Sequence, residues 1–143
     1  IAGIGRINCD QRQVTQVFTA LQAFWLRSIS FGHRHEAGPG EILAFACHQI
    51  KDGGAYPGIG AALPGGTRRM SQGTYAFPAI DVDVLVAATN TCPVGAYRGA
   101  GRPEATAMLE RIVDQVAHQL EIDPIELRLR NLLADAVFPY TTL

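Results

Sequence analysis

The sequence predicts an α+β fold built around a buried strand, a loop and a long helix. Residues 82–88 form a largely apolar run rich in β-branched side chains, which is typical of a buried strand. Over residues 103–120, apolar side chains recur at three- and four-residue steps, and Pro103 stands at the first helical position. Several glycines separate the two segments and favour a loop between them.

Segments that precede this core have patterns of their own. Apolar side chains at helical spacing predict a helix over residues 13–29. Residues 41–51 are predicted to form a strand with a strongly apolar centre. Glycine and proline then crowd residues 53–66, so a loop is predicted there, followed by a short helical turn over residues 67–72.

The helix over residues 103–120 has one apolar face, and a second helix is predicted after it. Asp123 is expected to cap that second helix, with Glu126 three residues later as in a capping box. Arg128 and Arg130 would then stand near its negative end, which accounts for their charge. The residues expected on the outer face of the first helix are Glu110, Arg111, Asp114 and Gln115.

The most informative segment is the glycine loop, residues 95–102, which joins the predicted strand to the long helix. Gly99 and Gly101 permit positive φ and close backbone approach, and Arg98 and Arg102 add positive charge. The first turn of the following helix leaves backbone N–H groups without acceptors, which favours an anion or a polar cofactor edge. A tight turn without a ligand is the alternative. The segment is no P-loop, because no Gly-Lys-Ser/Thr follows. Glu104 stands where a dinucleotide fingerprint needs a small residue.

Composition excludes several classes of partner. The 143 residues are 48% hydrophobic and 17% charged, which suits one ordinary soluble domain. A formal net charge of −1 gives no electrostatic reason to expect nucleic acid or an anionic membrane. No apolar run approaches the ~18 residues that a membrane helix needs, and the N-terminus lacks the order of a secretory signal. Because it begins without Met, the chain is expected to start inside a longer one.

Three cysteines occur, and their spacing contains no metal-binding or redox pair. Cys9, Cys47 and Cys92 are far apart and odd in number, which favours free thiols and a cytoplasmic location. Cys92 lies close to the glycine loop in a loop that leaves the predicted strand. A structural role is therefore expected for it rather than a reactive one.

The histidines offer one pattern that suggests a metal. His33 and His35 form a His-x-His pair beside Glu36. No third ligand cluster is near in sequence, so an exposed loop is expected there instead. His118 falls on the long predicted helix and is expected at its surface or edge.

Residues 95–105, with the sequence Gly-Ala-Tyr-Arg-Gly-Ala-Gly-Arg-Pro-Glu-Ala, resemble the active-site loop of molybdenum hydroxylase large subunits. That family includes xanthine dehydrogenases, aldehyde oxidases and aerobic carbon monoxide dehydrogenases. The resemblance runs from about residue 40 to residue 133 and includes residues 52–56, 89–91 and 123–128. It implies that residues 40–143 form part of a molybdopterin-binding domain, whereas residues 1–39 form a divergent N-terminal segment with a helix.

The resemblance implies roles for five residues of the glycine loop. Arg98, Gly99 and Gly101 would bind the cofactor, a molybdenum–pterin group in the molybdopterin or cytosine dinucleotide form. Tyr97 and Ala100 would line the substrate pocket. Gly99 stands where copper-dependent carbon monoxide dehydrogenases carry a cysteine, so no copper site is expected. Ala100 stands where xanthine dehydrogenases carry a phenylalanine, so purine selectivity is not expected either.

For the intact enzyme, the resemblance implies hydroxylation of an aldehyde or N-heterocycle with water as the oxygen source. Electrons would leave through iron–sulfur and FAD partners, and the remainder of the large subunit would be the third partner. The family's Gly-Gly-x-Phe-Gly pterin segment and its glutamate base do not occur in these residues. No catalytic residue and no protein metal ligand is therefore expected in this fragment, and the isolated chain is expected to be inactive and without stably bound cofactor.

Two alternatives from other classes stay open. The chain could be a non-catalytic remnant or interaction module that packs on a partner through its N-terminal helix. It could also be a phosphate- or nucleotide-binding domain that uses Gly99, Ala100 and Gly101.

Overall fold

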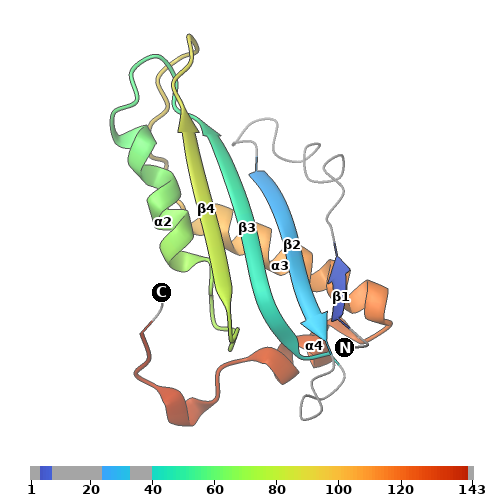
Figure 1. Ribbon diagram of the computed structural model, residues 1–143. Helices are drawn as coiled ribbons and strands as arrows, with labels where there is room; N and C mark the ends of the chain where they lie inside the picture. The colour runs from blue at the N-terminus through green and yellow to red at the C-terminus, as the bar shows by residue number, and fades with distance from the viewer. Residues whose placement is uncertain (1–3, 8–23, 33–39, 142–143) are drawn as a thin grey trace.

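A four-stranded sheet forms one layer of the molecule (Figure 1). The computed structural model describes residues 4–7, 24–32 and 40–141, and side chains within residues 40–141. The strands lie in the order β1-β2-β3-β4, with the first two pairs antiparallel and β3 parallel to β4. Their bounds are Ile4–Ile7 for β1, Phe24–Gly32 for β2, Ile42–Asp52 for β3 and Ile80–Ala87 for β4.

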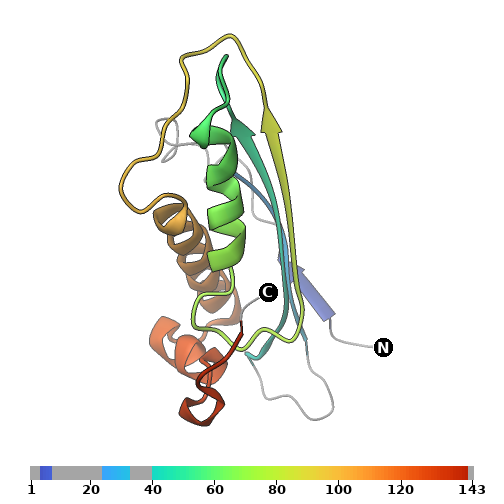
Figure 2. The ribbon, with the colours of Figure 1, turned by 90° about the vertical axis from the view of Figure 1, so that its left-hand side faces the viewer.

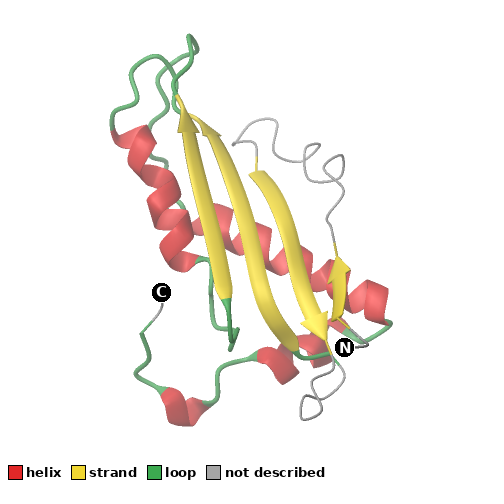
Figure 3. Cartoon of the chain, viewed as in Figure 1, coloured by secondary structure: helices red, strands yellow, loops and turns green. Residues whose placement is uncertain are grey.

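The helices of the described residues form the second layer, on one face of the sheet (Figure 2). Figure 3 shows how strands, helices and long loops divide the chain, and the α+β prediction is confirmed. The helices are η1 (Ile59–Ala62), α2 (Leu63–Met70), α3 (Arg102–Leu120), α4 (Pro124–Asn131) and η2 (Asp135–Val137).

The predicted order of strand, loop and helix is confirmed at the centre of the fold. β4 ends at Ala87, the glycine loop follows, and α3 begins at Arg102, with Pro103 in its first turn. In the parallel pair, Cys47 is in register with Val82 and Asp52 with Ala87. The carboxyl ends of β3 and β4 therefore lie side by side, and the loops that leave them project from the same end of the sheet (Figure 1).

The apolar stripe of α3 packs on the sheet, as its periodicity predicts. Phe45, Cys47 and Val82 face it from β3 and β4 and are at most 8% exposed. Full burial of one large aliphatic or aromatic side chain stabilises a fold by roughly 1.5–3 kcal/mol, so this stripe is the main source of cohesion between the layers. Its buried members are Ala105, Met108, Leu109, Ile112, Val113, Val116 and Ala117, whereas His118 is exposed as expected.

The helix predicted over residues 13–29 is wrong in its last part. Residues 24–29 belong to strand β2, which pairs with both β1 and β3. Aromatic side chains are frequent in this stretch and fit a strand as well as a helix, so pairing with distant strands decided the outcome. Residues 13–23 lie outside the described residues, as do His33, His35 and Cys9.

The loop predicted over residues 53–66 is wrong in its second half. Residues 59–62 form η1, and α2 begins at Leu63 instead of near residue 67. Pro64 is compatible with the helix because it stands in the first turn, where a missing N–H costs nothing. The helix was not predicted because it contains two glycines, which are typical of loops.

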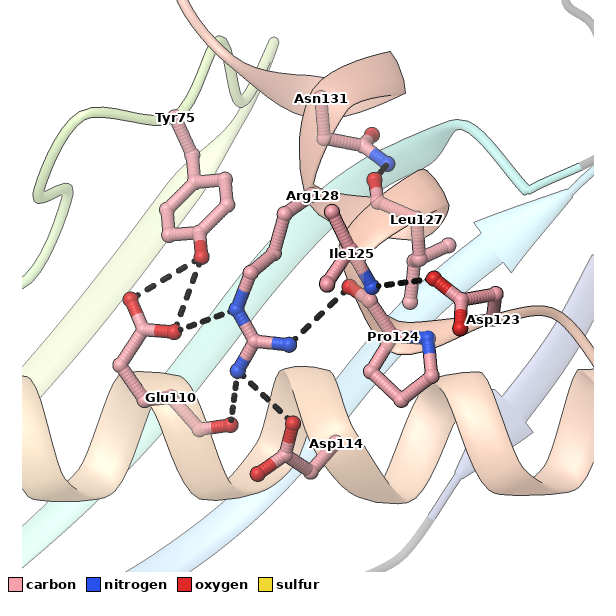
Figure 4. Close-up of polar contacts among 9 residues, drawn as sticks. All are labelled: Tyr75, Glu110, Asp114, Asp123, Pro124, Ile125, Leu127, Arg128 and Asn131. Carbon is pink, nitrogen blue, oxygen red and sulfur yellow. Dashed lines mark hydrogen bonds and ion pairs between the residues drawn. The ribbon is translucent and has the colours of Figure 1, made fainter.

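A polar network ties α3 to α4 and to the segment before β4 (Figure 4). Arg128 donates to Glu110 from Nε at 2.9 Å and to Asp114 from Nη2 at 2.7 Å. Tyr75 donates to the Glu110 carboxylate at 3.0 Å, and burial, then the hydrogen bond to Glu110, raises the pKa of Tyr75 to about 12. Glu110, predicted on the outer face, is thus only partly exposed. Arg128 not only lies near the negative end of α4 but also forms ion pairs with Glu110 and Asp114 of α3.

The cap of α4 agrees with its sequence. The Asp123 carboxylate accepts hydrogen bonds from the backbone N–H groups of Ile125 and Glu126, at 2.9 and 3.0 Å (Figure 4). The reciprocal half of a capping box is replaced, because the Glu126 carboxylate forms an ion pair with Arg130 one turn later.

Candidate functional site

Two loops meet beyond the carboxyl ends of β3 and β4, which is where ligands bind in many open sheets with parallel strands. Backbone hydrogen bonds join the loops from their first residues. Gly53 donates to Ala87 at 2.8 Å, Ala55 to Thr91 at 3.1 Å, and Thr89 back to the carbonyl of Gly54 at 3.2 Å. The two loops therefore behave as one structural unit.

The carboxylate of Asp52 fastens this unit. It accepts hydrogen bonds from the Thr89 hydroxyl at 2.5 Å, the Gly54 N–H at 2.8 Å and the Thr91 hydroxyl at 2.9 Å. These bonds, that from Thr89 above all, lower the pKa of Asp52 below its usual value. Asp52 therefore stays ionised and holds both loops at neutral pH.

Glycines allow the backbones at this end to pack with no side chain between them. A Cβ on Gly60 would lie 2.1 Å from the carbonyl oxygen of Val94, and one on Gly66 would lie 2.8 Å from that of Ala100. Such distances are far below ordinary van der Waals contact. The start of α2 is thus pressed directly against the glycine loop, which fixes the loop's position.

The glycine loop itself is a tight turn with three consecutive positive φ angles: 108° at Gly99, 46° at Ala100 and 97° at Gly101. Ala100 donates to the carbonyl of Tyr97 at 3.0 Å, and Arg102 to that of Gly99 at 3.1 Å. A left-handed conformation costs a residue with a Cβ about 1–2 kcal/mol, so surrounding contacts must hold Ala100 in place. Backbone hydrogen bonds within the loop and its close contacts with α2 together define the turn.

The predicted site residues divide into two groups. The side chains of Tyr97, Arg98 and Ala100 are exposed, Tyr97 by 87%. The glycines pack inward on the protein: a Cβ on Gly101 would lie 2.8 Å from the Leu63 carbonyl oxygen, and one on Gly99 2.7 Å from the Pro103 ring. Their close approach therefore has an explanation within the fold, and their role toward a ligand stays a prediction.

Arg98 and Arg102 are exposed beside the N-terminus of the 19-residue helix α3. Arg102 donates to the carbonyl of Gly99 at 3.3 Å. Arg98 has no hydrogen-bond or ion-pair partner within residues 40–141. Cationic side chains and a helix N-terminus both favour anions, so this surface fits an anionic group such as a molybdenum–pterin cofactor.

The sequence interpretation missed a buried polar layer behind the glycine loop. Gln49 and Lys51 on β3 and Thr67 on α2 are at most 1% exposed, and their side-chain polar atoms have no partner in the structure. Burial lowers the pKa of Lys51, while the charge of Glu104 acts in the opposite direction. Alternation along β3 from Phe45 would have put both strand residues on the inner face.

The remaining candidate groups are accounted for as follows. Cys47 is buried, and burial raises the pKa of its thiol to about 12, whereas Cys92 is exposed. In the part of the chain that the structure describes, no group of three or more His, Cys, Asp or Glu side chains could hold a metal ion. No helix there is long and apolar enough to cross a membrane.

Comparison with known proteins identifies the family. Residues 35–132 match the model of the molybdopterin cofactor-binding domain. The chain belongs to this family. The matched region contains β3, α2, β4, the glycine loop and α3, which together form the site described above.

Relatives of this chain are the large subunits of a hydroxylase and of a dehydrogenase. It is 35% identical over 106 residues to the nicotine 6-hydroxylase large subunit of Paenarthrobacter nicotinovorans, covering 71% of this chain and 13% of that protein. It is also 35% identical over 107 residues to the carbon monoxide dehydrogenase large chain of Hydrogenophaga pseudoflava, covering 72% and 13%. The chain thus spans about an eighth of the length of these relatives.

Solved structures of the family agree with the fold. Quinoline 2-oxidoreductase from Pseudomonas putida 86 superposes with a TM-score of 0.66 at 32% identity, covering 80% of this chain and 14% of that one. Aldehyde oxidoreductase from Desulfovibrio gigas gives 0.65 at 28% identity, covering 76% and 12%. The resemblance to molybdenum hydroxylase large subunits is therefore confirmed.

Proposed function

We propose that this chain supplies one wall of the cofactor and substrate pocket of a molybdenum hydroxylase large subunit. The enzyme oxidises an aldehyde or an N-heterocycle and takes its oxygen from water. One observation carries the proposal: the turn at the N-terminus of α3 holds Tyr97, Arg98 and Ala100 outward while its backbone is fixed by α2. Side chains that the fold leaves free on a rigid turn are well suited to bind a ligand.

Each residue of the turn has a separate task in this proposal. Arg98 binds the cofactor through its planar guanidinium, and Gly99 and Gly101 let the backbone pass beside it. When bound, the molybdenum–pterin group supplies the redox chemistry that removes electrons from the substrate. Tyr97 and Ala100 line the substrate side, where the small methyl group of Ala100 leaves room for varied substrates.

The rest of the machinery lies outside this chain in the proposal. A general base, the other pterin-binding segments, and the iron–sulfur and FAD partners come from the remainder of the enzyme. The cofactor is molybdopterin or its cytosine dinucleotide form. The complex works in the cytoplasm, where Cys47 and Cys92 stay reduced.

Variants of the intact large subunit that carries this segment test the proposal. Arg98→Ala removes a charged hydrogen-bonding group whose loss costs about 1–3 kcal/mol, so kcat/KM should fall roughly 10- to 100-fold for every substrate. Ala100→Phe adds an aromatic face and narrows the pocket, so preference should shift toward flat N-heterocycles. Both variants are assayed with a small aldehyde and an N-heterocycle.

Arg69→Ala, an exposed arginine on α2, serves as the matched control and should leave kcat/KM unchanged. If Arg98→Ala also leaves it unchanged, or Ala100→Phe alters both substrates equally, the loop does not line the pocket. For the chain by itself, elemental analysis should find no stoichiometric molybdenum, because only one cofactor-binding segment is present.

A further inference from the structure

Three buried polar side chains have no task in the proposed function. Gln49 and Lys51 are two residues apart on β3, so both side chains point toward the helices, as do those of Phe45 and Cys47. Thr67 is buried on α2, next to Gly101 of the glycine loop. Lys51 is 0% exposed and is the only lysine of the chain.

Their polar atoms are buried without partners. Gln49 Oε1 and Nε2, Lys51 Nζ and Thr67 Oγ1 have no hydrogen-bond partner in the structure. A buried polar group that is left dry costs the full free energy of its desolvation, and a charged one costs more. An occupant that completes the hydrogen bonds of these four atoms would remove this cost.

Of the three side chains, that of Thr67 lies directly behind the glycine loop. Thr67 Oγ1 is only 3.0 Å from the point where a Cβ on Gly101 would be, and Gly101 is the N-cap of α3. Glu104, in the first turn of α3, precedes by one turn Met108, whose sulfur lies 3.0 Å from that of Cys47 on the Lys51 face of β3. The charge of Glu104 raises the pKa of Lys51, yet no direct hydrogen bond joins the two side chains. Opposite charges that are near without touching are commonly bridged by water.

The mixture of donors and acceptors identifies the occupant. An anion would meet the Gln49 carbonyl oxygen and the Glu104 carboxylate, and a cation would meet the Lys51 ammonium. A water molecule donates and accepts, and buried waters typically satisfy groups of this kind.

We propose that ordered water molecules complete the hydrogen bonds of these buried groups between β3, α2 and the first turn of α3, and that they bridge Lys51 to Glu104. The water-mediated ion pair makes Lys51 a positioning residue for the glycine loop. The inference does not depend on the proposed function, because it concerns what fills the site and not which ligand the loop binds.

The single lysine allows a direct test in the full 143-residue chain. Labelling lysine with ¹³C and ¹⁵N gives a single set of side-chain signals, all from Lys51. Magnetisation transfer from long-lived water to the Lys51 ε-protons is expected, and its absence would show a dry site and overturn the proposal. Thr67→Val, which removes one hydrogen-bonding group, should weaken this transfer.

The bridge to Glu104 has its own readouts. Glu104→Gln should lower the titration midpoint of Lys51 and raise amide exchange of residues 97–101 about tenfold, while Glu121→Gln at the far end of α3 changes neither. Lys51→Met should raise the exchange rate of the same amides, whereas Lys51→Arg should keep that rate near the value of the parent chain. Unchanged titration in Glu104→Gln, or exchange that rises equally along all of α3, rules out the water-bridged pair.

Discussion

The two ends of α3 are held in different ways. From Met108 onward, the helix packs on the sheet through apolar side chains that are nearly all buried, and Arg128 crosses from α4 to fix its outer side. At its N-terminus, the glycine loop is held by backbone atoms of α2 that approach it directly, with Gly66 and Gly101 at the contact.

The difference explains where side chains remain exposed. Where side chains make the packing, few remain exposed, and their shapes are fixed by their neighbours. Where backbone atoms form the contact, the side chains are not needed for packing and can stay exposed, as those of Tyr97 and Arg98 do. Rigid backbone with free side chains is what a binding site needs.

The largest expected effect is at the end packed by side chains. Ile112 is fully buried, so Ile112→Ala should lower the free energy of unfolding by about 2–5 kcal/mol through lost burial and a residual cavity. Leu129→Ala, at a residue 67% exposed, should change it by less than about 0.5 kcal/mol. Urea unfolding of both variants measures the contrast, and equal losses would mean that α3 is not packed as described.

At the N-terminal end of α3, where backbone atoms make the contact, two neighbouring glycine variants are expected to change stability by smaller amounts and in opposite directions. Gly66→Ala forces a methyl group toward the Ala100 carbonyl and should cost about 1–3 kcal/mol. Gly65→Ala, one residue earlier in the same helix with open space around it, should instead stabilise the chain by roughly 0.5–1 kcal/mol. Thermal unfolding compares the two, and a stabilising Gly66→Ala would contradict direct contact between α2 and the glycine loop.

A third effect is a pH dependence of the Arg128 network. The folded chain raises the pKa of Tyr75 from 10.0 to about 12, so it holds the phenol proton more tightly than the unfolded chain. This contribution is fully present below pH 10 and is lost as pH rises through 12. Tyr75→Phe should therefore lose less stability than the parent between pH 10 and pH 12 in urea titrations. Tyr56→Phe, at a residue 77% exposed, should behave as the parent does.

Local patterns were enough to predict the centre of the fold. The 3.6-residue period gave α3 nearly to the residue, because its stripe is packed on one side only, and Asp123 caps α4 as its sequence indicates. The glycine loop was recognisable since its residues lie together in sequence. Both errors arose where contacts between distant parts of the chain determine the structure. Residues 24–29 form part of β2 because they pair with other strands, and a glycine is needed inside α2 because the helix contacts a distant loop.

The site was predicted only in part for the same reason. Tyr97 and Arg98 were named from one contiguous motif, whereas Gln49, Lys51 and Thr67 come from two elements that only the fold brings together. A polar residue at an inward position of an apolar strand is a signal that can be found in advance. It requires extending the alternation to the end of the strand instead of stopping at its apolar centre.

The backbone of the glycine loop is closed by hydrogen bonds from Ala100 to Tyr97 and from Arg102 to Gly99, none of which uses a side chain of residues 97, 98 or 100. Exchanging the side chains of residues 97 and 98 therefore alters the chemical surface without removing a hydrogen bond that closes the turn. At residue 100, whose φ is 46°, a β-branched replacement would be more strained than alanine. The atoms that hold the turn closed are thus separate from the side chains that shape its surface at residues 97 and 98.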